Sequence, residues 1–173
     1  MDGHEHPSSS LVVDNADART HIKIGLKLSN KGRYGVRAIF DIAFHGRGKA
    51  TQVKHIAERQ DIPPRFLEQI FQDLKKAGLV TSKRGPRGGY ALSRPSAEIS
   101  VGEVIRALEG KIQLDDETMS GDATGRAVTS RAFRELEADM EACLDAVSIE
   151  DLCERGEAEG IHRKPTHRYV YSI

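Results

Sequence analysis

Hydrophobic residues recur at three- and four-residue spacing from Pro64 to Lys76, and the period then changes. The apolar stripe of this predicted helix consists of Phe66, Leu67, Ile70, Phe71 and Leu74. Gly78 follows, where a glycine can take the left-handed conformation that ends a helix. Next come two short β-prone runs, VTS at 80–82 and YAL at 90–92, on either side of the segment KRGPRGG. This order predicts a helix, a short connection and a two-stranded hairpin.

Helical spacing also occurs upstream, where it predicts two further helices. The first is capped by Ser29 and ends around Gly46, and its apolar face consists of Val36, Ile39, Phe40, Ala43 and Phe44. The second begins at Thr51 and ends near Gln60, with Val53, Ile56 and Ala57 facing inward. Residues 61–63 then form a turn into the helix that starts at Pro64. Two short helices joined by such a turn make a helix-turn-helix, and the hairpin that follows predicts its winged form.

Downstream of the hairpin, Ser100 and Glu103 are spaced as a capping box for another helix. Its apolar stripe is Val101, Val104, Ile105 and Leu108, which we expect to close the module. The segment from 110 to 125 is polar, acidic and rich in glycine, and it is predicted to be a linker. Residues 148–151 resemble a final capped turn.

A long helix is predicted from about Arg126 to Val147, with apolar residues on one seam. The seam consists of Phe133, Leu136, Met140, Cys143 and Val147, at the spacing of a heptad repeat. Such a seam can pair with a second copy of the helix, giving a twofold dimer that presents two recognition helices. The alternative is that the helix folds back onto its own domain.

Three groups of polar residues are candidates for binding nucleic acid. On the polar face of the Pro64 helix, the long side chains able to reach base edges are Arg65, Glu68 and Gln69. The cations at the hairpin tip, suited to phosphate or a groove, are Lys83, Arg84 and Arg87. The group at the start of the first helix, a possible phosphate clamp, is Lys31, Arg33 and Tyr34. Each group alone is also compatible with an ordinary solvated surface, but their combination favours DNA binding.

Charge is strongly segregated although the net charge is zero. Residues 20–111 carry 18 Lys and Arg against 8 Asp and Glu, whereas residues 112–160 carry 4 against 14. A basic part followed by an acidic part indicates a nucleic-acid module and a second part that stays off the phosphates. Nothing resembles a signal peptide or a membrane-spanning run, so we predict a cytoplasmic protein. We also predict that it is not an enzyme, because no nucleophile–base set, phosphate loop or closed metal quartet is present.

Three segments together resemble a known family. LKLSNKGRYGVRAIFDIA, IAERQDIPPRFLEQIFQDLKKAGLVTSKRGPRGGYALSR and ISVGEVIRALEG are similar to bacterial transcription regulators of the IscR/CymR type. The resemblance covers residues 26–110 closely and continues loosely to about residue 152. It implies a homodimeric winged helix-turn-helix repressor or activator. It also implies that Arg65, Glu68 and Gln69 contact bases, that Arg84 enters the minor groove, and that Lys31, Arg33 and Tyr34 lie near phosphates.

The chain departs from the family members that sense iron–sulfur status. Those members carry three closely spaced cysteines in the loop before the dimer helix and a histidine just inside it. Here the loop 111–125 holds no cysteine, and Ala127 and Ser130 stand where the last cysteine and the histidine are expected. Its carboxylates are poor ligands for a cluster that prefers thiolates. We therefore predict no cofactor and no metal. Cys143 is expected to be a buried seam residue, and an exposed Cys153 is a weak candidate for a redox thiol.

Taken together, the sequence predicts a mainly α protein with a small β wing. The predicted parts are a disordered arm (1–26), a winged helix-turn-helix domain (27–110), an acidic linker (111–125), a dimerisation helix (126–153) and a flexible basic tail (154–173). The predicted function is a dimeric, sequence-specific DNA-binding regulator, a repressor at a palindromic promoter site, with a possible regulatory protein partner. Two alternatives remain open: an interaction module that binds a metabolic enzyme through the acidic helix, and a thiol or metal sensor that uses Cys153 with His162 or His167.

Overall fold

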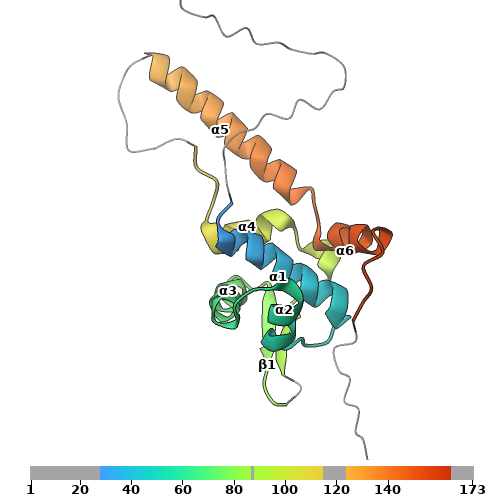
Figure 1. Cartoon of the computed structure of the whole chain (residues 1–173). Coiled ribbons are helices and arrows are strands. Elements are labelled where there is room, and N and C mark those ends of the chain that lie inside the picture. Colours follow the sequence, from blue (N-terminus) through green and yellow to red (C-terminus); the bar gives the residue numbers. More distant parts are fainter. Residues whose placement is uncertain (1–27, 87, 115–123, 165–173) are drawn as a thin grey trace, which may run out of the picture.

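The chain is mainly helical, with one small antiparallel hairpin (Figure 1). The computed structural model describes residues 28–86, 88–114 and 124–164. Its elements in chain order are α1 (Asn30–Gly46), α2 (Val53–Gln60), α3 (Pro64–Lys76), β1 (Val80–Lys83), β2 (Gly89–Leu92), the 3-10 helix η1 (Ser96–Glu98), α4 (Val101–Glu109), α5 (Thr124–Asp145) and α6 (Ile149–Ala158). The predicted fold class, a winged helix-turn-helix followed by a long helix, is confirmed. The predicted N-terminal arm lies outside the described residues.

Helix α1 is the centre of the fold, because α2, α3, α4, α6 and β2 all contact it. It supplies to the core the buried side chains of Ala38, Ile39, Ile42 and Phe44. The predicted stripe of α3 faces the same core through Leu67, Ile70, Phe71 and Leu74. Burying a side chain of this size contributes about 1.5–3 kcal/mol. The packing therefore fixes which face of α3 remains in solvent.

The start of α1 is held by its own cap and by the end of α4. Ser29 Oγ accepts hydrogen bonds from the backbone N–H groups of Lys31 and Gly32, as the predicted cap requires. Glu109 Oε1 accepts a second bond from Gly32 N at 2.9 Å and one from Ser29 Oγ at 2.7 Å. A carboxylate at this position also matches the positive end of the helix dipole.

The hairpin forms in the predicted place and pairs in a simple antiparallel register from Val80↔Leu92 to Lys83↔Gly89. One local prediction is wrong: Thr51 does not begin a helix. It is buried and forms an isolated β-bridge with Tyr90, and α2 begins two residues later. The physical reason is that the Thr51 backbone exchanges two hydrogen bonds with Tyr90, at 2.8 and 2.9 Å, which requires an extended conformation.

The C-terminal third differs from the prediction in two respects. Helix α5 ends at Asp145, so Val147 is not on its seam; instead the Val147 carbonyl accepts a hydrogen bond from Val101 N at 2.8 Å. The predicted single helix 126–153 is divided between α5 and α6, and α6 continues to Ala158, inside the segment predicted as a tail. Ser148 and Asp151 form a capping box that starts α6. Helix α6 packs on α1, whereas α5 extends away from the rest of the fold (Figure 1).

Candidate nucleic-acid interface

Helix α3 presents a polar face opposite its buried stripe. Arg65, Glu68 and Gln69 are all exposed, as the predicted polar face of this helix requires. Neighbouring positions on the helix, Leu67 and Ile70, are fully buried. Because α3 is anchored along its whole apolar side, these three side chains project from a rigid surface.

The first turn of α1 lies beside α3, so the structure brings the predicted phosphate clamp of Lys31, Arg33 and Tyr34 to the same region. Lys31 Nζ forms an ion pair with Asp73 Oδ2 of α3 at 2.8 Å. Hydrogen bonds from Lys31 and Lys76 lower the pKa of the Asp73 carboxyl. The Tyr34 ring meets the Phe66 ring edge-to-face, with centroids 5.7 Å apart. Arg33 is exposed and bonds to Asn30 within its own turn.

The hairpin supplies the third group. Lys83 ends β1 and Arg84 begins the tip, and both are exposed. Arg87 lies outside the described residues. The hairpin is held against α3, since the Phe71 and Tyr90 rings stack at 4.3 Å between centroids. Because Tyr90 lies one pair before the tip, Lys83 and Arg84 follow directly from a fixed part of the hairpin.

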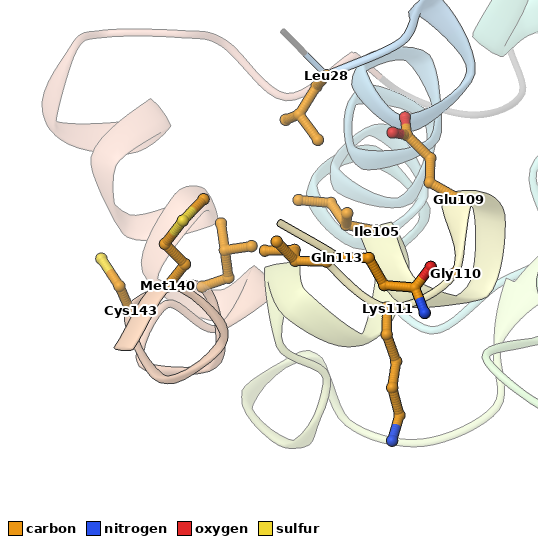
Figure 2. A pocket seen from close by; sticks show the side chains of 10 residues that line it. Leu28, Ile105, Glu109, Gly110, Lys111, Gln113, Met140 and Cys143 are labelled. Carbon is orange, nitrogen blue, oxygen red and sulfur yellow. The ribbon is translucent and has the colours of Figure 1, made fainter. Parts of the chain in front are cut away.

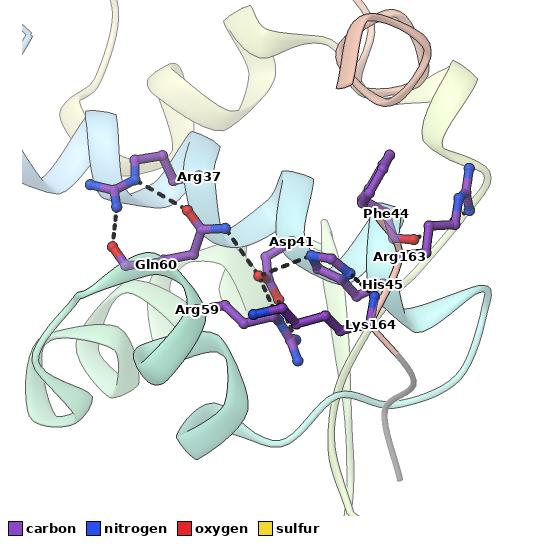
Figure 3. A network of polar contacts seen from close by, with 8 residues as sticks. All are labelled: Arg37, Asp41, Phe44, His45, Arg59, Gln60, Arg163 and Lys164. Carbon is purple, nitrogen blue, oxygen red and sulfur yellow. Dashed lines mark hydrogen bonds and ion pairs between the residues drawn. The ribbon is translucent and has the colours of Figure 1, made fainter. Parts of the chain in front are cut away.

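A buried polar network joins α2, the first helix of the helix-turn-helix, to α1 and was not predicted (Figure 3). Asp41 is fully buried and accepts bonds from Arg59 Nε and Nη2 at 2.9 and 2.6 Å and from Gln60 Nε2 at 3.0 Å. Arg37, one helical turn before Asp41 on α1, donates to the side chain of Gln60. A buried carboxylate persists only with such partners, so the network fixes the position of α2 on α1. An aspartate next to Ile42 and about one helical turn before Phe44, both of them apolar, was the available signal.

His45 continues this network toward the C-terminal segment. Its Nε2 lies 4.0 Å from Asp41 Oδ2, and its Nδ1 accepts a hydrogen bond from Lys164 N at 3.0 Å. Arg163 lies over the Phe44 ring at 4.8 Å and donates to the Phe44 carbonyl at 3.2 Å. Burial lowers the pKa of His45, and this outweighs the opposite effect of Asp41. Residues 163 and 164, predicted as flexible tail, therefore pack on α1.

Helix α5 leaves its apolar residues uncovered. Phe133 and Leu136 are 40% and 48% exposed. Met140 is half-buried, and Cys143, expected to be buried, is exposed in the single chain. Near the base of α5 a pocket of about 430 Å³ opens beside Met140 and Cys143, with Leu28 and Ile105 on its other side (Figure 2).

The described residues give no support to the sensor alternative. Cys153 is buried rather than exposed, and this burial raises its pKa to about 11, which disfavours the reactive thiolate. Across residues 28–86, 88–114 and 124–164, no group of three or more His, Cys, Asp or Glu side chains is arranged to hold a metal ion. His167 lies outside these ranges. Within them, no helix has the length and apolar character needed to cross a membrane.

A polar recognition helix, a basic wing and a capped first helix, all packed on one core, define a winged helix-turn-helix DNA-binding protein. The chain belongs to the Rrf2 family, whose model, described as an iron-dependent transcriptional regulator, matches residues 28–155. It is therefore a transcription regulator with a DNA-binding fold, which confirms the predicted IscR/CymR-type resemblance.

Individual relatives agree with this assignment. The HTH-type transcriptional regulator IscR of Aliivibrio salmonicida (strain LFI1238) is 38% identical over 141 residues, 79% of this chain and 82% of that one. IscR of Vibrio atlanticus (strain LGP32) is 37% identical over 134 residues, 76% and 78% of the two chains. Among solved structures, T. potens IscR superposes with a TM-score of 0.65 at 38% identity, covering 81% of this chain and 95% of that one. CymR, the global cysteine regulator of B. subtilis, gives 0.63 at 35% identity, with 75% and 98% covered.

Proposed function

We propose that this regulator acts as a homodimeric, sequence-specific repressor at a palindromic promoter site, without an iron–sulfur cluster. The observation that carries the proposal is the exposed set Arg65, Glu68 and Gln69, which projects from a helix buried along its other side. A protein of this kind works on the chromosome, in the cytoplasm.

The three polar groups divide the work of recognition. Arg65 can bond guanine, Gln69 adenine, and Glu68 the amino group of cytosine, because these pairings fit the donors and acceptors in the major groove. Arg84 suits the narrow minor groove next to the major-groove site, because the negative electrostatic potential in that groove attracts a cation. Lys31, Arg33 and Tyr34 bind phosphates and fix the orientation of the protein without reading sequence.

The exposed seam of α5 supports self-association. Phe133 and Leu136 lie on a helix that contacts its own domain mainly through α4. Pairing with α5 of a second copy covers these side chains and the apolar pocket at the base of the helix (Figure 2). Two wings and two recognition helices related by a twofold axis then match an inverted repeat in DNA.

The donor set supports a cluster-free regulator. The chain has two cysteines in all, and the loop from 111 to 125 has none. Cys143 is exposed on α5, whereas Cys153 is buried on α6. An iron–sulfur cluster held in the usual way needs thiolates in a common site, and these residues do not fit that requirement. The signal that this regulator senses therefore enters through another ligand or a protein partner.

Mapping the cross-linked protein on its own chromosome tests the proposed function, followed by titration of the purified protein on the strongest site. We expect a few sharp peaks over a shared inverted repeat. A dimer that neutralises about 6–10 phosphates loses roughly 10³–10⁵ in affinity between 50 and 200 mM salt. Either a lack of peaks or a flat salt response at the strongest site would overturn the proposal and favour the interaction module, in which α5 binds another protein.

A further inference from the structure

The wing is attached to the rest of the fold at two levels, and Gln52 provides the outer one. The inner level is the cross-strand pair of Ser82 and Tyr90, one pair before the tip. There Thr51 and Tyr90 exchange two backbone hydrogen bonds, and Lys75 Nζ of α3 donates to Ser82 Oγ at 2.7 Å. At the tip, Gln52 Nε2 donates to the Pro86 carbonyl at 2.8 Å.

The bond from Gln52 is made in place of a helix cap. Gln52 is the N-cap residue of α2, but its side chain makes no capping hydrogen bond. A cap side chain contributes about 1 kcal/mol to a helix, and glutamine is not among the preferred cap residues. At this position the side chain therefore bonds to the wing and not to the N-terminus of α2.

The backbone where β2 begins, beside the tip, is packed too closely against Thr51 for the wing to be displaced as a whole. Gly89 has a φ of 141°, and a Cβ there would lie 2.1 Å from the Thr51 carbonyl oxygen. At the tip the chain folds back on itself, since Gly88 N donates to the Gly85 carbonyl at 2.8 Å. The ladder is therefore rigid at Gly89 and Tyr90, and the remaining freedom is in the turn that begins at Arg84.

That freedom matters because the wing is a sheet of two strands, β1 and β2, of four residues each. A hairpin of this size is marginally stable by itself. Arg84 lies two residues before Pro86, so the bond from Gln52 holds the turn that carries it. Without that bond, the turn is held through Lys83 and Gly89, where it joins the two strands.

We propose that Gln52 is a positioning residue for the wing: it joins the tip to the start of α2 and so determines where Arg84 meets DNA. This inference rests on the proposed function. It assigns to Gln52 a part in specificity although Gln52 itself contacts no base. The effect is confined to the base step under the wing, because the α3 contacts are held by a separate set of buried side chains.

The test is a double-mutant cycle of Gln52→Met and Arg84→Ala on one operator. Methionine keeps the length of glutamine and removes the donor without adding charge. We expect Gln52→Met to weaken binding about threefold to tenfold, the scale of one hydrogen bond. In the Arg84→Ala background we expect the same change to have almost no further effect. Base discrimination at the wing step should relax, and discrimination at the steps under α3 should stay unchanged.

Two further measurements distinguish a specific effect on the wing from a general effect of the substitution on the protein. Glu154→Met places the same side chain at an exposed position of α6, away from the wing and from the proposed dimer surface, and should leave wing specificity as in the wild type. Amide hydrogen exchange of free protein should be faster at Gly88 in Gln52→Met, with unchanged exchange in the core of α1. Additive losses in the cycle, or unchanged exchange at the tip, would overturn the role of Gln52. If instead the wild type binds no operator, the proposed function itself fails.

Discussion

The recognition helix α3 and the long helix α5 show the same amphipathic design with opposite outcomes. On α3 the apolar stripe is buried, fully at all positions except the half-buried Phe66, and the polar face is exposed. On α5 none of the residues 125–145, all of which the structure describes, is buried, and Phe133 and Leu136 remain in solvent. The difference lies in the available partner: α3 is covered by α1, α2 and α4, whereas α5 meets its own domain near one end. A covered stripe positions a helix, and an uncovered one is available for association.

The largest predicted effect measures this difference directly, with the same substitution on both helices. We expect Leu67→Ala in α3 to lower the free energy of unfolding by about 2–5 kcal/mol, because it opens a cavity in the core. Leu136→Ala in α5 should stay within about 0.5 kcal/mol of the wild type, as at an exposed site. Urea unfolding, at dilutions where the midpoint no longer depends on concentration, checks both values. Equal losses would show that α5 is held by its own domain.

A charge on the seam tests the role of the uncovered stripe. We expect Phe133→Glu to raise the Kd of the dimer by about a hundredfold, roughly 2.8 kcal/mol, because pairing must desolvate the carboxylate. Ala138→Glu adds the same charge on another face of α5 and should leave association unchanged. Sedimentation equilibrium of the two variants provides the comparison. A Phe133→Glu chain that still dimerises normally would exclude the seam as the interface.

Removing one wing cation distinguishes a specific contact with DNA from the general electrostatic attraction of a positive charge to DNA. Arg84→Ala should weaken operator binding by about 1–3 kcal/mol, the scale of a specific base contact. Arg131→Ala removes one positive charge from α5 and should have little effect on the same operator. Fluorescence anisotropy titrations at one salt concentration measure both. Identical affinities for Arg84→Ala and the wild type would remove Arg84 from the recognition site.

The smallest predicted effect concerns pH and depends on His45, which is buried on α1. The pKa of His45 is lowered in the folded chain, while the unfolded chain binds a proton near the ordinary value of 6.5. Stability is therefore complete above that pH and falls as pH drops toward the folded pKa, since the unfolded state then binds more protons. His45→Gln should flatten this part of the curve. Urea unfolding from about pH 5 to pH 8 tests it, and an unchanged slope would rule out His45 as the titrating group.

Most of the DNA-facing module could be predicted from local patterns. The stripe of α3, the cap at Ser29 and the capping box at Ser100 each depend on residues a few positions apart, so the sequence shows them directly. The exposed positions of Arg65, Glu68 and Gln69 follow from the same periodicity. The errors lie where distant segments decide: Thr51 is drawn into a bridge with Tyr90, and Val147 is held by Val101.

The sequence by itself determined the elements of this regulator, their order, the basic and acidic halves and the residues offered to DNA, because periodicity and charge are local properties. Only the tertiary structure decided which of these residues share a surface. It paired Lys31 with Asp73, buried Asp41 among Arg59 and Gln60, and bound the wing tip to Gln52, 34 positions away. It also buried Cys153 and left Cys143 exposed. Such contacts depend on how helices pack, and side-chain burial is settled only when the partners come together.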